Sequence, residues 1–170
     1  TRNYATFVVG GASESNSATD GQGQDDLSVF EGDMQGATSL AVWTGQVTVL
    51  FTLVPNQPIV FAADDQHRAR TEDAWKSWSE RRYYDEPWRL EWYAVLPLTK
   101  SVVRGMDAVT QWSAENLPTG ALTRFSVTGC SKRGFTSWYV AAFDPRVVAV
   151  MPCCMALNLI VHGQHLWQAL

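Results

Sequence analysis

The residue types and spacing that could support catalysis occur in one stretch, Gly129-Cys130-Ser131-Lys132-Arg133-Gly134. A β-rich run, Phe125 to Thr128, leads into it, and apolar residues at helical spacing follow it. A strand, a tight turn with a central serine and a helix are the layout of a nucleophile elbow, which exposes the serine hydroxyl at the end of a sheet. The first N–H groups of the helix would face the negative charge that develops in acyl transfer. The turn therefore predicts Ser131 as a nucleophile and the backbone N–H of Lys132 as an oxyanion donor.

Two basic residues distinguish this turn from the common one. The usual elbow has a glycine two residues after the serine, whereas Gly134 comes three residues after it, behind Lys132 and Arg133. Cations in the first turn of a helix oppose its dipole, at about 0.3–1 kcal/mol each when exposed. They predict a positive collar for an anionic intermediate or an acidic substrate group, with Arg133 as a substrate-binding residue. The alternative is an ordinary strand–helix turn with solvated basic side chains.

Further candidate residues lie where predicted strands end. Gly10 and Gly11 close a strand over residues 6–9 and could supply a second oxyanion donor, although an ordinary strand-end turn is the slightly favoured interpretation. Asn56, a candidate substrate-binding residue, lies in the Pro-Asn-Gln-Pro turn that ends a buried strand over 46–53. In open α/β sheets, sites form beyond the carboxyl ends of the strands. We therefore expect these two loops and the elbow to converge on one crevice.

An acidic pair, Glu72 and Asp73, follows Arg70 and Thr71. One interpretation is an acid shell near the site, in which both acids bind substrate. The other is a helix N-terminus capped by Thr71, with acids that suit the helix dipole and a local ion pair with Arg70. Capping chemistry favours the second interpretation.

A serine nucleophile needs a histidine base and an acid that orients it. In this fold class the acid and then the histidine follow the serine along the chain. The one acid after the elbow is Asp144, in an Asp-Pro-Arg turn between helix and strand, where a structural pairing with Arg146 is expected. That turn lies at the wrong end of the sheet. His162 and His165 come too soon after the elbow for a triad histidine. We therefore expect the acid and the histidine beyond Leu170.

Alternating strands and helices must position these residues. Strands are predicted over 6–9, 46–53, 125–128 and 147–151, and helices within 27–43, from 71 to 82, from 97 to a stop at 117–120, and from the elbow to 143. Residues 12–26 are predicted to form an exposed loop, residues 83–93 an irregular segment, and residues 156–170 a helical or loop-like tail. This order predicts an α/β domain over residues 1–170, with a mostly parallel, doubly wound sheet and helices on both faces.

Composition excludes several classes of protein. The chain has 170 residues, 46% hydrophobic and 18% charged, as expected of a globular domain. A net charge of -4 without a basic tract argues against a nucleic-acid partner, and no apolar run reaches the length of a membrane span. Cys130, Cys153 and Cys154 are predicted to be buried free thiols. No metal site or cofactor is expected. The chain starts without Met or signal peptide, so a missing true N-terminus is expected and targeting signals do not reveal its compartment.

An ordered set of motifs resembles the PhoPQ-activated pathogenicity-related protein family, which also includes a secreted autocrine proliferation repressor of amoebae. The motifs are Leu53 to Pro58, Arg70 to Ala74, Leu98 to Asp107, Val127 to Trp138, Asp144 to Val147 and Ala156 to Leu159. The family is similar to α/β hydrolases. The resemblance implies an α/β-hydrolase-like fold, a secreted or extracytoplasmic location, and a chain that is the N-terminal part of a longer domain.

The elbow also resembles the Gly-Cys-Ser-Arg-x-Gly elbow of glucuronoyl esterases, which implies that Lys132 helps to stabilise the oxyanion. Three positions depart from the family. It usually has Ala where Cys130 stands, Trp where Phe135 stands and an Asp near Ala156. The first two changes preserve the class of side-chain volume, and the third removes a loop contact.

Two functional hypotheses follow. The first is a serine hydrolase that acts on an ester or amide of a small molecule, peptide or glycan. The second is a catalytically silent secreted signalling or assembly protein that keeps the fold and binds a protein partner. A carbohydrate-binding or cell-wall esterase role rests on the esterase resemblance and on a cleft expected around Trp88 and Trp92, although core and interface packing is the simpler explanation for tryptophans.

Overall fold

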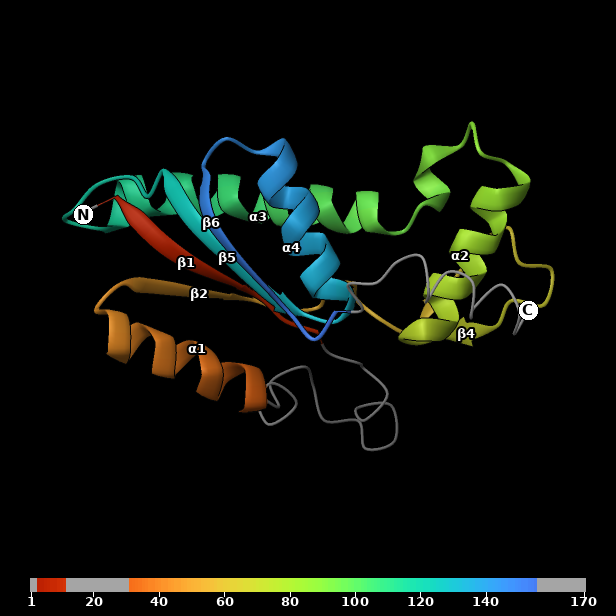
Figure 1. The fold of residues 1–170 in the computed structure, drawn as a ribbon, viewed down its shortest axis with the longest axis horizontal. Coiled ribbons are helices and arrows are strands. Elements are labelled where there is room, and N and C mark those ends of the chain that lie inside the picture. Colours follow the sequence, from red (N-terminus) through yellow and green to blue (C-terminus); the bar gives the residue numbers. More distant parts are fainter. Residues whose placement is uncertain (1–2, 12–30, 156–170) are drawn as a thin grey trace.

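The centre of the fold is a parallel four-stranded sheet, seen in a computed structural model that describes residues 3–11 and 31–155. Its strands are β1 (Tyr4–Val9), β2 (Val47–Phe51), β5 (Arg124–Cys130) and β6 (Val147–Cys153), in the spatial order β2-β1-β5-β6 (Figure 1). All three strand pairs are parallel. The predicted α/β class is confirmed, and β1 and β5 are the two central strands.

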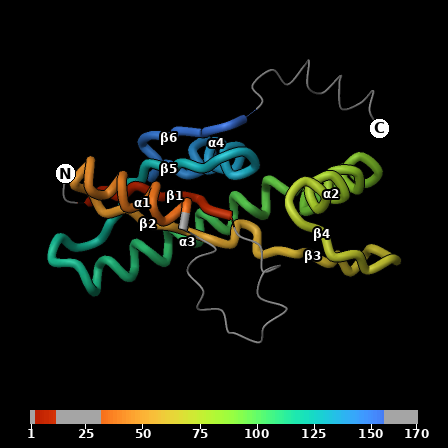
Figure 2. Tube along the Cα trace, turned by 90° about the horizontal axis from the view of Figure 1, so that it is seen from below, coloured from red at the N-terminus to blue at the C-terminus, as the bar shows by residue number. Residues whose placement is uncertain are grey.

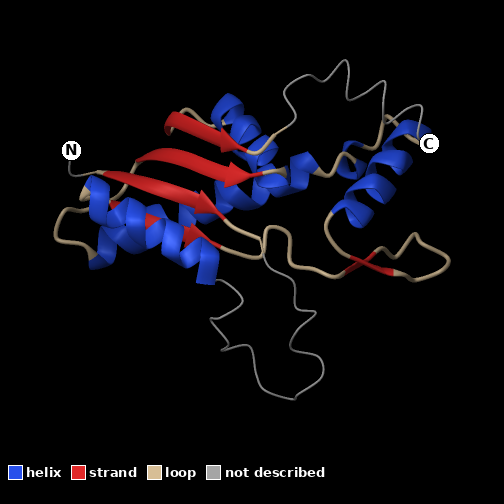
Figure 3. Cartoon of the chain, turned by 60° about the horizontal axis from the view of Figure 1, so that its bottom comes forward, coloured by secondary structure: helices blue, strands red, loops and turns tan. Residues whose placement is uncertain are grey.

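Helices cover both faces of this sheet, as predicted for a doubly wound fold. Figure 3 shows α1 (Glu31–Thr44) in front of the strands, with α3 (Val95–Asn116) and α4 (Lys132–Phe143) behind them. α1 packs against β1 and β2, whereas α3 and α4 pack against each other. No helix in the described ranges is long and apolar enough to cross a lipid bilayer.

The main core lies between the sheet and α3. Phe7 packs against the rings of Phe51 and Phe125, with centroids 5.4 and 6.2 Å away. Gly105 lets α3 approach this cluster, because an added Cβ there would lie 3.0 Å from the Phe51 ring. The predicted apolar face of α3 is buried at Leu98, Val102 and Met106, whereas Trp112 at its end is 55% exposed. Each buried side chain of this size contributes about 1.5–3 kcal/mol.

The chain between β2 and α3 forms a separate group of elements. It consists of a short antiparallel hairpin, β3 (Ile59–Val60) and β4 (Ala69–Arg70), followed by α2 (Asp73–Asp85) and the 3-10 turn η3 (Leu90–Trp92). Figure 2 shows these elements beyond the end of the sheet, on the side where the strands finish. Phe61 stacks on Trp78 with centroids 4.3 Å apart, and Trp92 meets both rings edge-on. These contacts give the group an aromatic core of its own.

The tryptophans divide between packing and surface positions. Trp75, Trp78 and Trp92 are packed, which fits the expected core role, whereas Trp88 is 74% exposed. Trp88 and Trp92 therefore do not share one environment.

Several local predictions are wrong. Thr71 does not cap α2: the N-cap residue is Glu72, which makes no side-chain cap hydrogen bond. Cys130 and Cys154 are exposed and not buried. The helix expected to start at Pro97 begins two residues earlier, at Val95. The expected loop over 12–26, the tail over 156–170, His162 and His165 lie outside the described residues.

Candidate functional site

The elbow has the predicted strand–turn–helix form. β5 ends at Cys130, α4 begins at Lys132, and Ser131 between them is exposed with φ 56 and ψ -120. A positive φ at a residue other than glycine costs about 1–3 kcal/mol and persists only where the surroundings impose it. Part of that constraint is visible: the Ser131 N–H donates to the carbonyl of Cys153 at the end of β6, at 2.9 Å.

Two glycines make this turn sterically possible. An added Cβ at Gly129 would lie 2.7 Å from the carbonyl oxygen of Arg133, and one at Gly134 would lie 2.8 Å from the carbonyl oxygen of Cys153. The first glycine lets the opening turn of α4 lie over the end of β5. The second lets it lie against the end of β6. The contact with β6 gives a steric reason for a glycine three residues after the serine.

The basic pair is buried and charge-paired. Lys132 and Arg133 are each 8% exposed, so the alternative interpretation with solvated basic side chains is wrong. Arg133 donates to both carboxylate oxygens of Glu72, at 3.0 and 3.1 Å, and through Nε to the carbonyl of Val54, at 2.7 Å. The Nζ of Lys132 lies 2.8 Å from Glu72 and 2.7 Å from Asp73. Two cations thus meet two carboxylates, and the collar carries no net charge.

Glu72 and Asp73 therefore lie beside the elbow and do not pair with Arg70. The partner of Arg70 is Asp64. The local ion pair expected within the segment from Arg70 to Asp73 is wrong, because residues far apart in sequence supply the counter-charges.

These contacts fix the protonation states. Hydrogen bonds from Arg133, then from Lys132 and Gln57, outweigh burial and lower the pKa of Glu72 to about 2. Burial acts to lower the pKa of Lys132, but its hydrogen bonds to Asp73 and Glu72 prevail and raise it. Lys132 therefore stays protonated at neutral pH and cannot serve as a general base.

Acid should weaken the fold through Glu72. A carboxylate whose pKa falls on folding stabilises the protein above its unfolded pKa of 4.5, and this contribution disappears as the pH falls to about 2. Glu72→Gln should therefore lower stability at neutral pH, and its unfolding curve should converge with that of the wild type near the lower value. We expect about 1–2 kcal/mol at neutral pH, less than full linkage would give, because the side chain is 46% exposed and solvent screens it.

Urea unfolding across this pH range measures that difference. Glu80→Gln, which removes a surface partner of Lys76 at i,i+4, is the matched control and should keep the wild-type acid profile. A constant gap between Glu72→Gln and the wild type at every pH would contradict the assignment.

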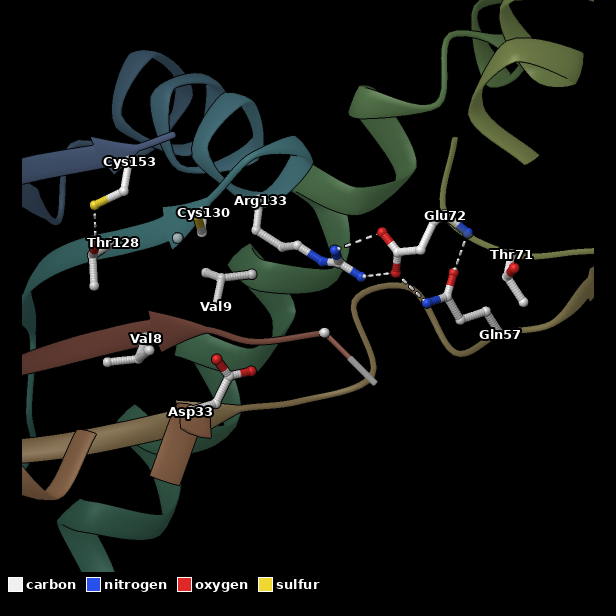
Figure 4. Close-up of a pocket in the computed structure, with 12 residues that line it drawn as sticks. Val8, Val9, Asp33, Gln57, Thr71, Glu72, Thr128, Cys130, Arg133 and Cys153 are labelled. Atoms are coloured by element: carbon white, nitrogen blue, oxygen red, sulfur yellow. Dashed lines mark hydrogen bonds and ion pairs between the residues drawn. The ribbon is translucent and has the colours of Figure 1, made fainter. Parts of the chain in front are cut away.

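The three expected loops converge on one cavity of about 460 Å³ (Figure 4). Its lining comes from both central strands and the loop after β1, β6, the helices α1 and α4, the turn after β2 and the segment before α2. The lining residues are Val8, Val9, Gly11, Asp33, Gln57, Thr71, Glu72, Thr128, Gly129, Cys130, Arg133 and Cys153. Of the predicted residues, Gly11, Glu72 and Arg133 line it. Ser131 and Asn56 are not among the lining residues; both are exposed, and each is next to one in sequence, Cys130 and Gln57 respectively.

The two glycines after β1 differ in what their backbone can offer. The N–H of Gly10 donates to the carbonyl of Phe51 at 2.8 Å, so it is not free to stabilise an oxyanion. Gly11 lies against the elbow, because an added Cβ there would be 2.2 Å from Nη2 of Arg133. Gly11 is therefore the better placed of the two as a second donor.

Sequence comparison gives this geometry a family context. A family model described as PhoPQ-activated pathogenicity-related protein matches residues 3–169. The chain belongs to the PhoPQ-activated pathogenicity-related protein family. It is also 36% identical over 133 residues to autocrine proliferation repressor protein A of Dictyostelium discoideum, an alignment that covers 74% of this chain and 25% of that protein. The chain thus spans about a quarter of that relative's length. No solved structure matches it.

In this member of the PhoPQ-activated family, the acid after the elbow has a structural role, as expected. Asp144 follows the last residue of α4 and accepts hydrogen bonds from the backbone and guanidinium of Arg146, the shortest at 2.6 Å. Within the described ranges the one histidine is His67, which is exposed in the β3–β4 turn and does not line the cavity.

Sequence reasoning missed several polar residues of this family member's cavity, among them Gln57 and Asp33. Gln57 lies next to the predicted Asn56, but it is the residue that turns inward and is 1% exposed. Asp33 lies in the first turn of α1, and its Oδ2 would be 2.6 Å from a Cβ added to Gly10. The Pro-Asn-Gln-Pro turn at a strand end was a sequence signal that could have identified Gln57. Asp33 has no such signal, because its place in the cavity depends on how α1 packs on β1.

Proposed function

We propose that this chain carries the nucleophile and the oxyanion donors of a serine hydrolase of the α/β type that acts on an ester or amide. The observation that carries the proposal is the backbone of Ser131, with φ 56 and ψ -120 at the junction of a central parallel strand and a helix. A strained serine on a strand-to-helix turn is the hallmark of a nucleophile elbow. The chain belongs to the PhoPQ-activated pathogenicity-related family, but the description of that family does not name a reaction.

In the proposed reaction, Oγ of Ser131 attacks the substrate carbonyl carbon and its proton passes to a histidine. The backbone N–H groups of Lys132 and Gly11 receive the developing oxyanion. As the tetrahedral intermediate collapses, the histidine gives its proton to the leaving atom, which releases the alcohol or amine and leaves an acyl-enzyme on Ser131. Water, deprotonated by the histidine, then hydrolyses the acyl-enzyme to the acid and restores the Ser131 hydroxyl. The histidine and its orienting acid are proposed to come from residues outside the described part of the protein. No cofactor enters these steps.

The size of the cavity suits a modest ligand. About 460 Å³ falls within the range of about 300–1,000 Å³ that small-molecule sites occupy, and its lining mixes apolar and polar side chains. The site is therefore proposed to hold part of a small-molecule, peptide or glycan ester and not a large folded partner.

An active-site-directed fluorophosphonate tests the proposal. The full-length protein should be labelled on Ser131, and Ser131→Ala should lose labelling almost completely, by a factor of about 10³ or more. Ser137→Ala is the matched control, because Ser137 lies in the same helix, is buried and donates to the carbonyl of Arg133. Equal labelling of wild type and Ser131→Ala would exclude Ser131 as the nucleophile.

The alternative is a catalytically silent signalling or assembly protein. The name of the Dictyostelium relative describes repression of proliferation and not hydrolysis, which favours this reading for that protein. A secreted or extracytoplasmic location is part of both proposals. If no histidine of the full-length protein can reach Ser131 and the fluorophosphonate does not react, the signalling proposal replaces the enzymatic one.

A further inference from the structure

Gln57 lies at the centre of a buried polar network that sequence reasoning did not anticipate. Its Oε1 accepts hydrogen bonds from the backbone N–H of Glu72, at 2.8 Å, and from Nε1 of Trp75, at 2.9 Å. Its Nε2 donates to Oε1 of Glu72. A buried amide with one carbonyl and one N–H function satisfied in this way fixes the groups around it, because every alternative arrangement leaves a polar atom unpaired.

The network joins two helix starts that share one unusual backbone conformation. Glu72 immediately precedes α2 with φ 49 and ψ -120, and Ser131 immediately precedes α4 with φ 56 and ψ -120. Neither residue caps its own helix with its side chain. At Glu72 the amide of Gln57 binds both the backbone N–H and the carboxylate, so it opposes relaxation of this backbone to an ordinary conformation.

The connection continues from Glu72 to the elbow. The carboxylate of Glu72 holds the guanidinium of Arg133 through two hydrogen bonds (Figure 4). It also lies 2.8 Å from Nζ of Lys132. Lys132 and Arg133 are the first two residues of α4. Their backbone N–H groups point out of the helix start, because the first N–H groups of a helix have no partner within it.

We propose that Gln57 is a positioning residue for the nucleophile elbow: by fixing Glu72, it orients the first turn of α4 and hence the hydroxyl of Ser131 and the oxyanion donor at Lys132. The inference rests on the proposed hydrolase function for its catalytic consequence. Its structural part, that Gln57 holds the elbow through Glu72, stands on the contacts alone.

Gln57→Glu separates this role from general packing. The two side chains have nearly the same shape, and the new carboxylate keeps an acceptor for Trp75 and for the Glu72 N–H. It loses the donor to Glu72 and brings two carboxylates into contact, beside Arg133, Lys132 and Asp73. As the pH falls, one proton bound by the carboxylate pair restores a donor between them. The defect should therefore be reversed by acid, which loss of packing would not be.

The experiment compares wild type, Gln57→Glu, Gln57→Asn and Ser79→Ala. Two quantities are measured between about pH 8 and about pH 5.5: the rate of fluorophosphonate labelling at Ser131, and hydrogen exchange of the segment 129–136. At the higher pH, Gln57→Glu should be labelled about tenfold more slowly than wild type and its elbow should exchange faster. At the lower pH, the labelling rate and the exchange rate of Gln57→Glu should both approach the wild-type values. Gln57→Asn, which is too short to reach Glu72, should show a smaller defect that does not change with pH.

Ser79→Ala is the control for damage to α2, because it removes a buried hydrogen bond from the same helix, to the carbonyl of Trp92 at 2.5 Å. It should match wild type at the elbow. Wild-type exchange in both Gln57 variants, or a Gln57→Glu defect that is constant with pH, would overturn the inference. If Gln57→Glu fails to fold, the exchange rate of segment 129–136 in Gln57→Asn still shows whether Gln57 holds the elbow. If wild type is not labelled at all, the hydrolase proposal fails, while hydrogen exchange still decides whether Gln57 holds the elbow.

Discussion

Gly129→Ala is expected to lower the stability of the protein by about 3 kcal/mol or more, at the upper end of what overpacking costs. The added methyl carbon would lie 2.7 Å from the carbonyl oxygen of Arg133 and 2.8 Å from its carbonyl carbon. These are backbone atoms of the first turn of α4, and Oγ of Ser137 donates to the same carbonyl at 2.8 Å. The helix can escape the clash only by leaving its contacts with β5 and β6. Thermal unfolding followed by circular dichroism measures the loss.

Gly36→Ala is the matched control for this prediction. Gly36 lies inside α1, and an added Cβ would meet nothing within 4 Å. Alanine is the better helix former, so this variant should gain up to about 1 kcal/mol. If Gly129→Ala unfolded at the wild-type temperature, the start of α4 would have to be far less constrained than these contacts indicate.

Arg133→Met is expected to cost about 2–3 kcal/mol. Methionine fills a similar volume without charge, so the substitution leaves the carbonyl of Val54 and the carboxylate of Glu72 without their main partner. The loss should be smaller than for a fully buried ion pair, because Glu72 is partly exposed and water can rehydrate it. Arg133→Lys should be intermediate, since it keeps the charge but not the two parallel hydrogen bonds.

Arg104→Met provides the comparison on the surface. Arg104 pairs with Asp107 at 2.9 Å, but its side chain is 74% exposed. Its loss should change stability by less than about 0.5 kcal/mol. Chemical unfolding of the three variants gives the order directly, and equal effects of Arg133→Met and Arg104→Met would contradict the central position assigned to Arg133.

The sequence predicts those parts of the fold that depend on neighbouring residues. The run from Phe125 to Thr128 and the turn after it identify the elbow, because strand propensity, glycine and helical spacing are local signals. The apolar face of α3 is equally local: Leu98, Val102 and Met106 recur at helical intervals and are buried together. Alternation of such elements is enough to predict a parallel sheet covered on both faces.

The parts that sequence did not predict depend on distant partners. Arg133 finds its counter-charge in Glu72, 61 positions away, and no local rule links the two. The start of α2 is another case: its N-cap is Glu72, whose N–H donates to Gln57, 15 positions away, and no local rule predicts that contact. The β3–β4 hairpin was missed because strands of two residues are too short to show any periodicity.

The shared backbone of Ser131 and Glu72 has a consequence for engineering. Glycine adopts a positive φ without steric cost, so at both positions it would relieve strain that the present residues carry. A library selected for thermostability alone would therefore tend to accumulate glycine at 131 and so remove the candidate nucleophile, whereas at 72 glycine would also remove the ion pairs with Arg133 and Lys132. At Ser131 stability and the proposed activity make opposite demands, and a redesign of this protein has to keep that side chain fixed from the start.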